Sequence, residues 1–133
     1  MLMRCLGFMI LMLVLAPISA RAETVLYCQS ELATGIVEEN GSWRTGNFKR
    51  ERYTIKFNHD YSEVDGVSYA PMTCTMPYSW LAVVHCVQLG YNHSTFRYNK
   101  ETKRFVLYTN PAEGYVSGSS DTDTIEAGSC VVF

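Results

Sequence analysis

The most regular pattern along the chain is a strict alternation of apolar and polar residues between positions 52 and 57. Tyr53, Ile55 and Phe57 alternate there with basic or hydroxyl side chains. Successive side chains of a β-strand point to opposite faces of its sheet. The pattern therefore predicts a strand with one buried face and one solvated face.

Other short runs rich in β-forming residues are separated by turn signals along the rest of the chain. The further predicted strands cover 24–29, 72–76, 95–98, 105–109 and 124–133. The turn signals are Asn40-Gly41, Asp65-Gly66, the charged loop 99–103 and Asn110-Pro111. This spacing predicts an all-β fold of about seven to eight short strands, arranged as a small antiparallel barrel or a sandwich.

The segment from Trp80 to Val87 is ambiguous. Its apolar residues at positions 80, 83, 84 and 87 have the spacing of one helical face. However, the segment is short, rich in valine and follows Pro77 closely, which favours a strand. We predict a strand and keep a helix as the alternative.

The first 22 residues have the three-part organisation of a secretory signal peptide. Arg4 supplies a positive charge, residues 5–16 are almost entirely apolar, and Ala20 and Ala22 occupy the small-residue positions of a cleavage site. The apolar run is shorter than the roughly 20 residues of a membrane-spanning helix. We expect cleavage after Ala22 and a single β domain, residues 23–133, that is soluble, has no membrane contact, and is periplasmic or secreted.

Removal of residues 1–22 changes the charge balance. Nine basic and thirteen acidic residues remain, a net charge of −4 instead of −2. Nucleic-acid binding normally requires a basic face, so nucleic acid is not an expected partner.

Four cysteines remain after cleavage, and an even number in a short exported chain predicts two disulfides with three possible pairings. Cys74 and Cys86 flank a short segment, so they can face each other across one hairpin. Cys28 would then pair with Cys130 and join the first strand to the last. A zinc site or a catalytic thiol is the alternative, but the chain contains no Cys-x-x-Cys and export favours oxidation.

Candidate metal ligands do not form a recognised pattern, and we expect no cofactor or metal. The histidines, which are not spaced as ligand pairs, are His59, His85 and His93. Asp121, Asp123 and Glu126 are candidates for calcium, but a solvated acidic loop is the preferred interpretation.

Residues 117–124 form the most polar stretch and are predicted to be a mobile loop. Ser117, Gly118, Ser119 and Ser120 are a possible binding loop within it. A serine nucleophile here lacks the Gly-x-Ser-x-Gly context, and the domain is small for an enzyme with a substrate cleft. We therefore expect no catalytic residues and no enzyme, with a small hydrolase kept as an alternative.

Basic residues form two local clusters that would bind an anionic polymer if the strands brought them together. An ordinary solvated sheet face is the preferred interpretation. The clusters are Lys49, Arg50, Arg52 and Lys56, and Arg97, Lys100, Lys103 and Arg104.

Three short motifs give the chain a resemblance to small exported bacterial proteins of unassigned function. They are Tyr27-Cys28, the Cys-x-x-Pro-Tyr-x-Trp run from Cys74 to Trp80, and the Gly-x-Cys-x-x-Phe run from Gly128 to Phe133. This resemblance supports export and the fold, and implies no activity.

Ser117-Gly118-Ser119 gives a weaker similarity to periplasmic inhibitors of C-type lysozyme. Those inhibitors are small β-barrels that insert a Ser-Gly-Ser loop into the enzyme's cleft. In that family a basic residue and a tyrosine follow, whereas Ser120-Asp121 follow here. The expectation is therefore a non-enzymatic binding protein with an unknown protein or small-molecule partner, and the alternative is an inhibitor of a cell-wall hydrolase.

Overall fold

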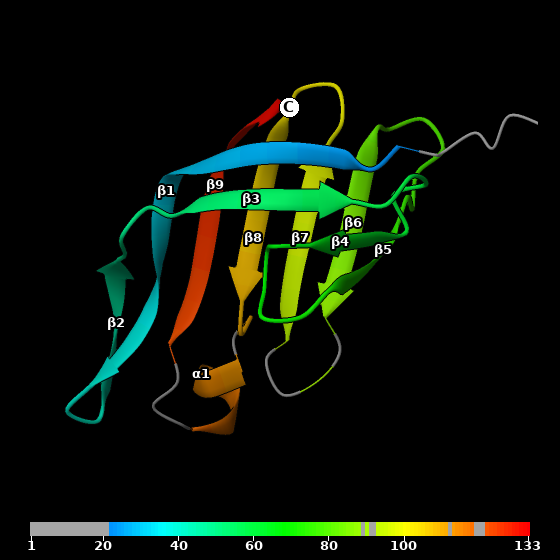
Figure 1. The fold of residues 1–133 in the computed structure, drawn as a ribbon. Helices are drawn as coiled ribbons and strands as arrows, with labels where there is room; N and C mark the ends of the chain where they lie inside the picture. Colours follow the sequence, from blue (N-terminus) through cyan, green and yellow to red (C-terminus); the bar gives the residue numbers. More distant parts are fainter. Residues whose placement is uncertain (1–21, 89, 91–92, 112, 119–121) are drawn as a thin grey trace, which may run out of the picture.

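The computed structural model describes residues 22–88, 90, 93–111, 113–118 and 122–133. The predicted signal peptide lies outside these residues apart from Ala22. The described part contains nine strands and one short helix (Figure 1). Their bounds are β1 Thr24–Glu39, β2 Ser42–Asn47, β3 Arg52–Phe57, β4 Glu63–Asp65, β5 Met72–Thr75, β6 Val83–Gln88, β7 Ser94–Asn99, β8 Arg104–Thr109, α1 Glu113–Ser117 and β9 Asp123–Val132. No helix in the described part of the chain has the length and apolar character needed to span a bilayer.

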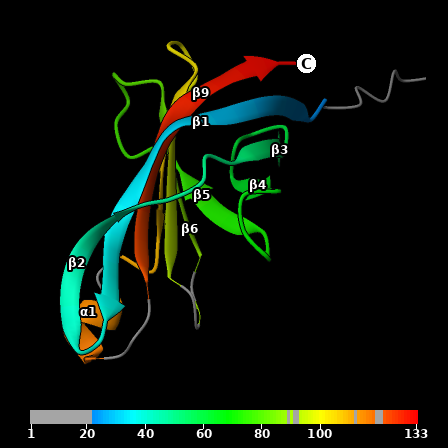
Figure 2. The ribbon, with the colours of Figure 1, turned by 90° about the vertical axis from the view of Figure 1, so that its left-hand side faces the viewer.

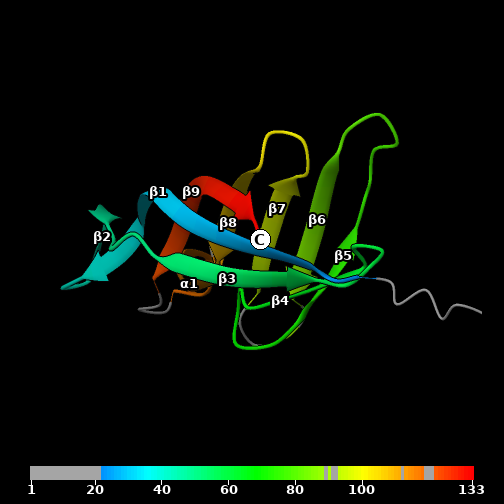
Figure 3. The same cartoon turned by 45° about the horizontal axis from the view of Figure 1, so that its top comes forward.

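Eight of the strands close into an antiparallel barrel. The hydrogen-bonded order is β2-β1-β3-β4-β5-β6-β7-β8-β9, and β9 pairs back onto β1. The strand β2 pairs with β1 alone and is therefore an addition to the barrel. In Figures 1 and 3, β1 and β3 cross steeply over the layer formed by β6 to β9. The predicted all-β fold is confirmed, and of the two architectures it is the barrel. Its eight strands match the expected seven to eight, and β2 is a ninth strand outside the barrel.

The first strand is much longer than the predicted 24–29. Residues 24–29 of β1 pair with β3, residues 26–36 pair with β9, and residues 34–39 pair with β2. The register of β1 against β9 shifts between Ser30 and Leu32, just after the pairing of β1 with β3 ends at Gln29. Asn40 and Gly41 have φ angles of 54° and 78°, which match the tight hairpin turn that their sequence predicts.

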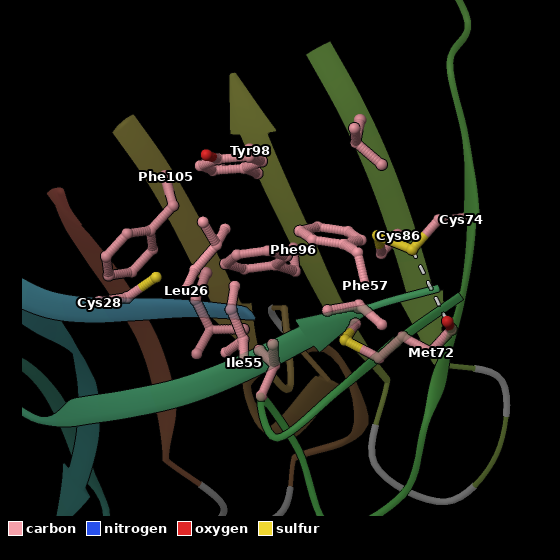
Figure 4. Close-up of a cluster of buried hydrophobic side chains, with 14 of the residues drawn as sticks. Leu26, Cys28, Ile55, Phe57, Met72, Cys74, Cys86, Phe96, Tyr98 and Phe105 are labelled. Carbon is pink, nitrogen blue, oxygen red and sulfur yellow. Dashed lines mark hydrogen bonds between the residues drawn. A yellow bond between two sulfur atoms is a disulfide. The ribbon is translucent and has the colours of Figure 1, made fainter. Parts of the chain in front are cut away.

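Aromatic rings fill the inside of the barrel, and Figure 4 shows them between the crossing strands. The ring centroid of Phe57 lies 5.6 Å from that of Tyr98 and 6.4 Å from that of Phe96, and Phe96 lies 5.8 Å from Phe105. Ile55 and Phe57 have no exposed surface and Tyr53 is half-buried, which confirms the alternation predicted for β3.

Both disulfides join residues that lie directly opposite each other on paired strands. Cys28 is bonded to Cys130 across β1 and β9, and Cys74 to Cys86 across β5 and β6, each with a Cα–Cα distance of 3.9 Å. The amides of Cys130 and Cys74 donate hydrogen bonds to other strands or loops, so these are non-hydrogen-bonded pairs, whose side chains approach most closely. The preferred pairing is confirmed, and the zinc and thiol alternatives are wrong.

The ambiguous segment is a strand from Val83 to Gln88, as predicted, whereas its first three residues, 80–82, lie in the loop before the strand. In β6, Val84, Cys86 and Gln88 are buried and alternate with half-buried residues that face outward. Trp80 precedes this strand and lies in a turn.

Gly128 of β9 lies where β1 and β9 approach each other closely. A Cβ atom at this position would lie 2.0 Å from the carbonyl oxygen of Gln29 and 2.8 Å from the ring of Phe105. Neither backbone can move away without opening the barrel. This position therefore requires a residue without a side chain.

We predict that Gly128→Ala lowers the free energy of unfolding by about 3 kcal/mol or more, because the added methyl group overlaps backbone as well as core. Gly46→Ala in β2 is the matched control, since its Cβ would meet its nearest neighbours at 3.4 Å or more. The control is expected to change stability by no more than about 0.5 kcal/mol. Urea denaturation measures both variants, and equal losses would contradict the close approach.

Candidate functional site

The loop between β5 and β6, residues 76–82, exposes a group of apolar side chains. Trp80 is 78% exposed, and its ring lies 5.5 Å from that of Tyr78. Met76 and Leu81 of the same loop are each more than 40% exposed. Figure 1 places this loop at the same end of the barrel as the loop between β7 and β8. Clustered exposed apolar side chains mark interaction sites on soluble proteins.

Three interactions hold this loop in place. The Cys74–Cys86 disulfide closes its base, directly beside the paired residues Thr75 and His85. Within the loop, the amide of Leu81 donates to the carbonyl of Tyr78 at 3.4 Å. At its end, the amide of Lys100 donates to the carbonyl of Ala82 at 2.8 Å, which ties the loop to the β7–β8 connection.

Beneath Tyr78, the outer face of β6, β7 and β8 is hollowed. One hollow of about 220 Å³ is lined by Pro77, Tyr78, Val83, His85 and Arg97. A second of about 350 Å³ shares Tyr78, Val83 and Arg97 with the first.

The second hollow extends to Arg104 and Val106 on β8. Strand register explains this arrangement, because Arg97 lies opposite both His85 and Val106, and Arg104 is two residues from Val106. All of these side chains point away from the core.

The charge of these hollows comes from their two arginines. Among the described residues, neither Arg97 nor Arg104 forms an ion pair or a side-chain hydrogen bond, and no acidic residue lines either hollow. Burial and then the charge of Arg97 lower the pKa of His85, which keeps this imidazole neutral at pH 7. Its buried Nε2 has no hydrogen-bond partner in the described part of the chain. Two guanidinium groups without partners beside exposed aromatic rings are suited to hold an anionic group.

A polar cluster lies inside the barrel. Glu126 of β9 is only 9% exposed, and its carboxylate accepts hydrogen bonds from the hydroxyls of Ser30 and, at 2.8 Å, Tyr53. Burial, and then the hydrogen bond and charge of Glu126, raise the pKa of Tyr53 far above its usual value. Ser30 has no exposed surface. The two hydroxyls therefore supply hydrogen bonds to the buried carboxylate of Glu126, and the cluster stabilises the packing of β1, β3 and β9.

The predicted solvated acidic loop is wrong for two of its three residues. Asp123 and Glu126 are both buried in β9, because pairing with β1 begins at Asp123, opposite Ile36. Asp121 lies outside the described residues. The described residues contain no group of three or more histidine, cysteine or acidic side chains suited to a metal ion.

The possible binding loop at positions 117–120 is described only in part. Ser117 is the last residue of α1 and Gly118 follows with a φ angle of 73°, so the predicted mobile loop is wrong at Ser117 and at the start of β9. Ser119 and Ser120 lie outside the described residues. Figure 1 shows α1 at the end of the barrel opposite the β5–β6 loop, and Figure 2 shows it beside β2.

In the structure, the lysines of the two predicted basic clusters interact with neighbouring residues. Lys49 and Lys56 form ion pairs with Glu51 and Glu23 at 3.8 and 3.0 Å. The Lys100 ammonium lies over the ring of Tyr61, 4.8 Å from its centroid, and the Lys103 ammonium donates to the carbonyl of Lys100. The arginines are left facing outward.

The sequence pattern does not distinguish Tyr78 and Trp80 as site residues, and it groups Trp80 with the valines at 83, 84 and 87 in one periodic segment. The available signal was a tryptophan between Pro77 and the next strand, inside a hairpin closed by two cysteines.

Comparisons of the chain with protein-family models, with curated proteins and with solved structures find no significant match.

We predict that the buried side chain of Tyr98 makes the protein less stable at alkaline pH. Burial, and then the charge of Tyr61, raise the pKa of Tyr98 to about 12, whereas an unfolded tyrosine ionises near pH 10. Tyr98 therefore contributes stability below pH 10 that is lost as the pH rises towards 12, by up to about 1.4 kcal/mol per pH unit. Denaturation between pH 9 and 12 should show a weaker decline for Tyr98→Phe than for Tyr69→Phe, whose side chain is 70% exposed. Identical slopes would contradict the raised pKa.

Proposed function

We propose that this chain is an exported, non-enzymatic binding protein whose partner docks on the outside of the barrel. The contact surface comprises Tyr78, Trp80, His85, Arg97 and Arg104, and we call it the Trp80 surface. The observation that carries the proposal is the exposed pair of aromatic rings above hollows that hold two unpaired arginines. Tryptophan, tyrosine and arginine are the residues that most often dominate binding energy at interfaces.

The packing of the interior supports docking on the outside. The rings of Phe57, Phe96, Tyr98 and Phe105 contact one another across the barrel, and all four are 2% exposed or less. A small-molecule site inside a barrel requires space that these rings occupy.

The disulfides support export. Two disulfides indicate that the protein folds in an oxidising environment outside the cytoplasm. The proposal adds that residues 1–22 direct secretion, that cleavage follows Ala22, and that the domain remains in the periplasm or is secreted.

The proposal predicts that Trp80→Ala and Tyr78→Ala each weaken partner binding by about 30-fold, the effect of losing a hot-spot side chain worth roughly 2 kcal/mol. The measurement is quantitative mass spectrometry of proteins and glycans retained from the exported fraction by the immobilised domain. Tyr69→Ala is the control, because this tyrosine is 70% exposed and does not line the hollows of the Trp80 surface. Retention that is equal for all three variants and the wild type would refute the proposal.

A hydrolase inhibitor is the second candidate, and one observation favours it. Tyr115 and Val116 of α1 are 58% and 79% exposed directly before Ser117, and the Tyr115 ring packs 5.5 Å from that of Trp43 on β2. This apolar end is a second surface suited to protein contact. If it inserts into a lysozyme cleft, excess protein will abolish the activity of C-type lysozyme, and Val116→Asp will restore it. Full lysozyme activity in the presence of excess wild-type protein would exclude this candidate.

A further inference from the structure

We infer that the Trp80 surface is one end of a groove that binds a linear acidic polysaccharide across the outside of the barrel. The inference rests on the proposed function and adds the class of ligand and the path that it follows.

The hollows that make up the groove adjoin one another, because neighbouring hollows share lining residues. The hollow containing Arg97 and Arg104 shares Arg104 and Val106 with a third, of about 510 Å³. The third shares Ser129 with a fourth, of about 420 Å³, which extends to Arg52. The strand register gives the same path, because Arg104 lies opposite Ser129, Ser129 opposite Gln29, and Gln29 opposite Arg52.

The length of this path suits a chain-like ligand. It runs from β6 over β7, β8, β9 and β1 to β3, as the sheet order requires. Five strand spacings of about 4.8 Å give a path of roughly 24 Å. A single small anion would occupy only one of these hollows.

The charges along the groove are positive and spaced. Arg97 and Arg104 lie on adjacent strands, and Arg52 is three strands further, a separation of about 14 Å. Arg52, like the other two, has no ion pair among the described residues. Among the described residues that line the four hollows, the one acidic side chain is Glu31 in the third hollow. Its carboxylate accepts a hydrogen bond from the Ser129 hydroxyl at 2.7 Å.

This arrangement contrasts with the charge of the whole domain. Residues 23–133 carry a net charge of −4, which repels acidic polymers in general. A line of three unpaired arginines on such a domain therefore favours a ligand whose negative charges are also spaced along a line.

The side chains between the arginines suit sugar rings. Gln29, Thr54 and Ser129 place amide and hydroxyl groups along the groove, which match the hydroxyls of a sugar. Exposed aromatic rings lie at both ends, with Tyr78 and Trp80 at one end and Tyr27, which is 44% exposed, at the other. Their flat, amphipathic faces can pack against the apolar side of a sugar ring while polar groups bind its substituents.

Peptides and nucleic acids fit this groove less well. A peptide that adds a strand to a sheet requires a free edge. Within the described residues, each strand beneath the groove is paired on both sides, and the strand paired on one side only is β2. Nucleic acid normally requires more positive charge than three arginines on an acidic domain provide.

The test uses defined polymers and the full mature domain. Binding of alginate oligosaccharides, dextran sulfate, neutral dextran, poly-glutamate and a single-stranded oligonucleotide is measured by biolayer interferometry at low and moderate salt. We expect one or both acidic polymers to bind, with an affinity that falls as salt rises, and neutral dextran not to bind. The alginate and dextran sulfate arms distinguish carboxylate from sulfate as the recognised group.

Variants test the path of the ligand. Arg97→Ala and Arg104→Ala are each expected to weaken binding of long and short oligosaccharides about tenfold, whereas Arg52→Ala should weaken only the long ones. Lys49→Ala is the matched control, because this lysine is exposed, is paired with Glu51 and lies outside the groove. Near-ultraviolet circular dichroism confirms that each variant keeps the wild-type fold.

The inference is overturned if neutral dextran binds as well as the acidic polymers, if only poly-glutamate or a single-stranded oligonucleotide binds, or if the arginine variants match Lys49→Ala. If no acidic polysaccharide binds while Trp80→Ala still reduces partner retention, the inference fails and the proposed function stands. If Trp80→Ala retains its partner as well as the wild type does and no acidic polysaccharide binds, both fail.

Discussion

The antiparallel pairing of β1 with β9 is the contact on which the structure depends, because it converts a sheet into a closed barrel. Residues 26–36 of β1 pair with β9 over almost the full length of that strand. The backbones are so close that a Cβ at Gly35 or Gly128 would lie about 2 Å from a carbonyl oxygen of the opposite strand. The Cys28–Cys130 disulfide crosslinks the same two strands. In the chain-entropy model such a long loop contributes about 4.7 kcal/mol, a large part of the 5–15 kcal/mol of a typical small domain.

Closure determines which side of the sheet can interact with other molecules. Once the barrel closes, the inward faces of β3, β7 and β8 form one aromatic core. The same strands then carry their polar residues outward. Arg97 lies between Phe96 and Tyr98, and Arg104 precedes Phe105, so the alternation that builds the core also builds the groove.

The second disulfide connects oxidative folding to the exposed loop. Cys74 and Cys86 lie one position inside Thr75 and His85, the last pair of β5 and β6 before the loop that carries Tyr78 and Trp80. Because this bridge closes the base of the loop, the environment that permits the disulfide also orders the aromatic end of the Trp80 surface.

The local elements follow from the order of the residues alone. Alternation specified the faces of β3, the turn residues at Asn40-Gly41 specified a hairpin, and the cysteine spacing favoured the correct disulfides. Other features emerge only when the chain folds. They are the choice of a barrel over a sandwich, the extension of β1 to Glu39, the burial of Asp123 and Glu126, the exposure of Trp80, and the alignment of Arg52 with Arg104. Side-chain periodicity is a property of neighbouring residues, whereas these features depend on how segments distant in the chain come together, above all on the register between β1 and β9, which are about 100 positions apart.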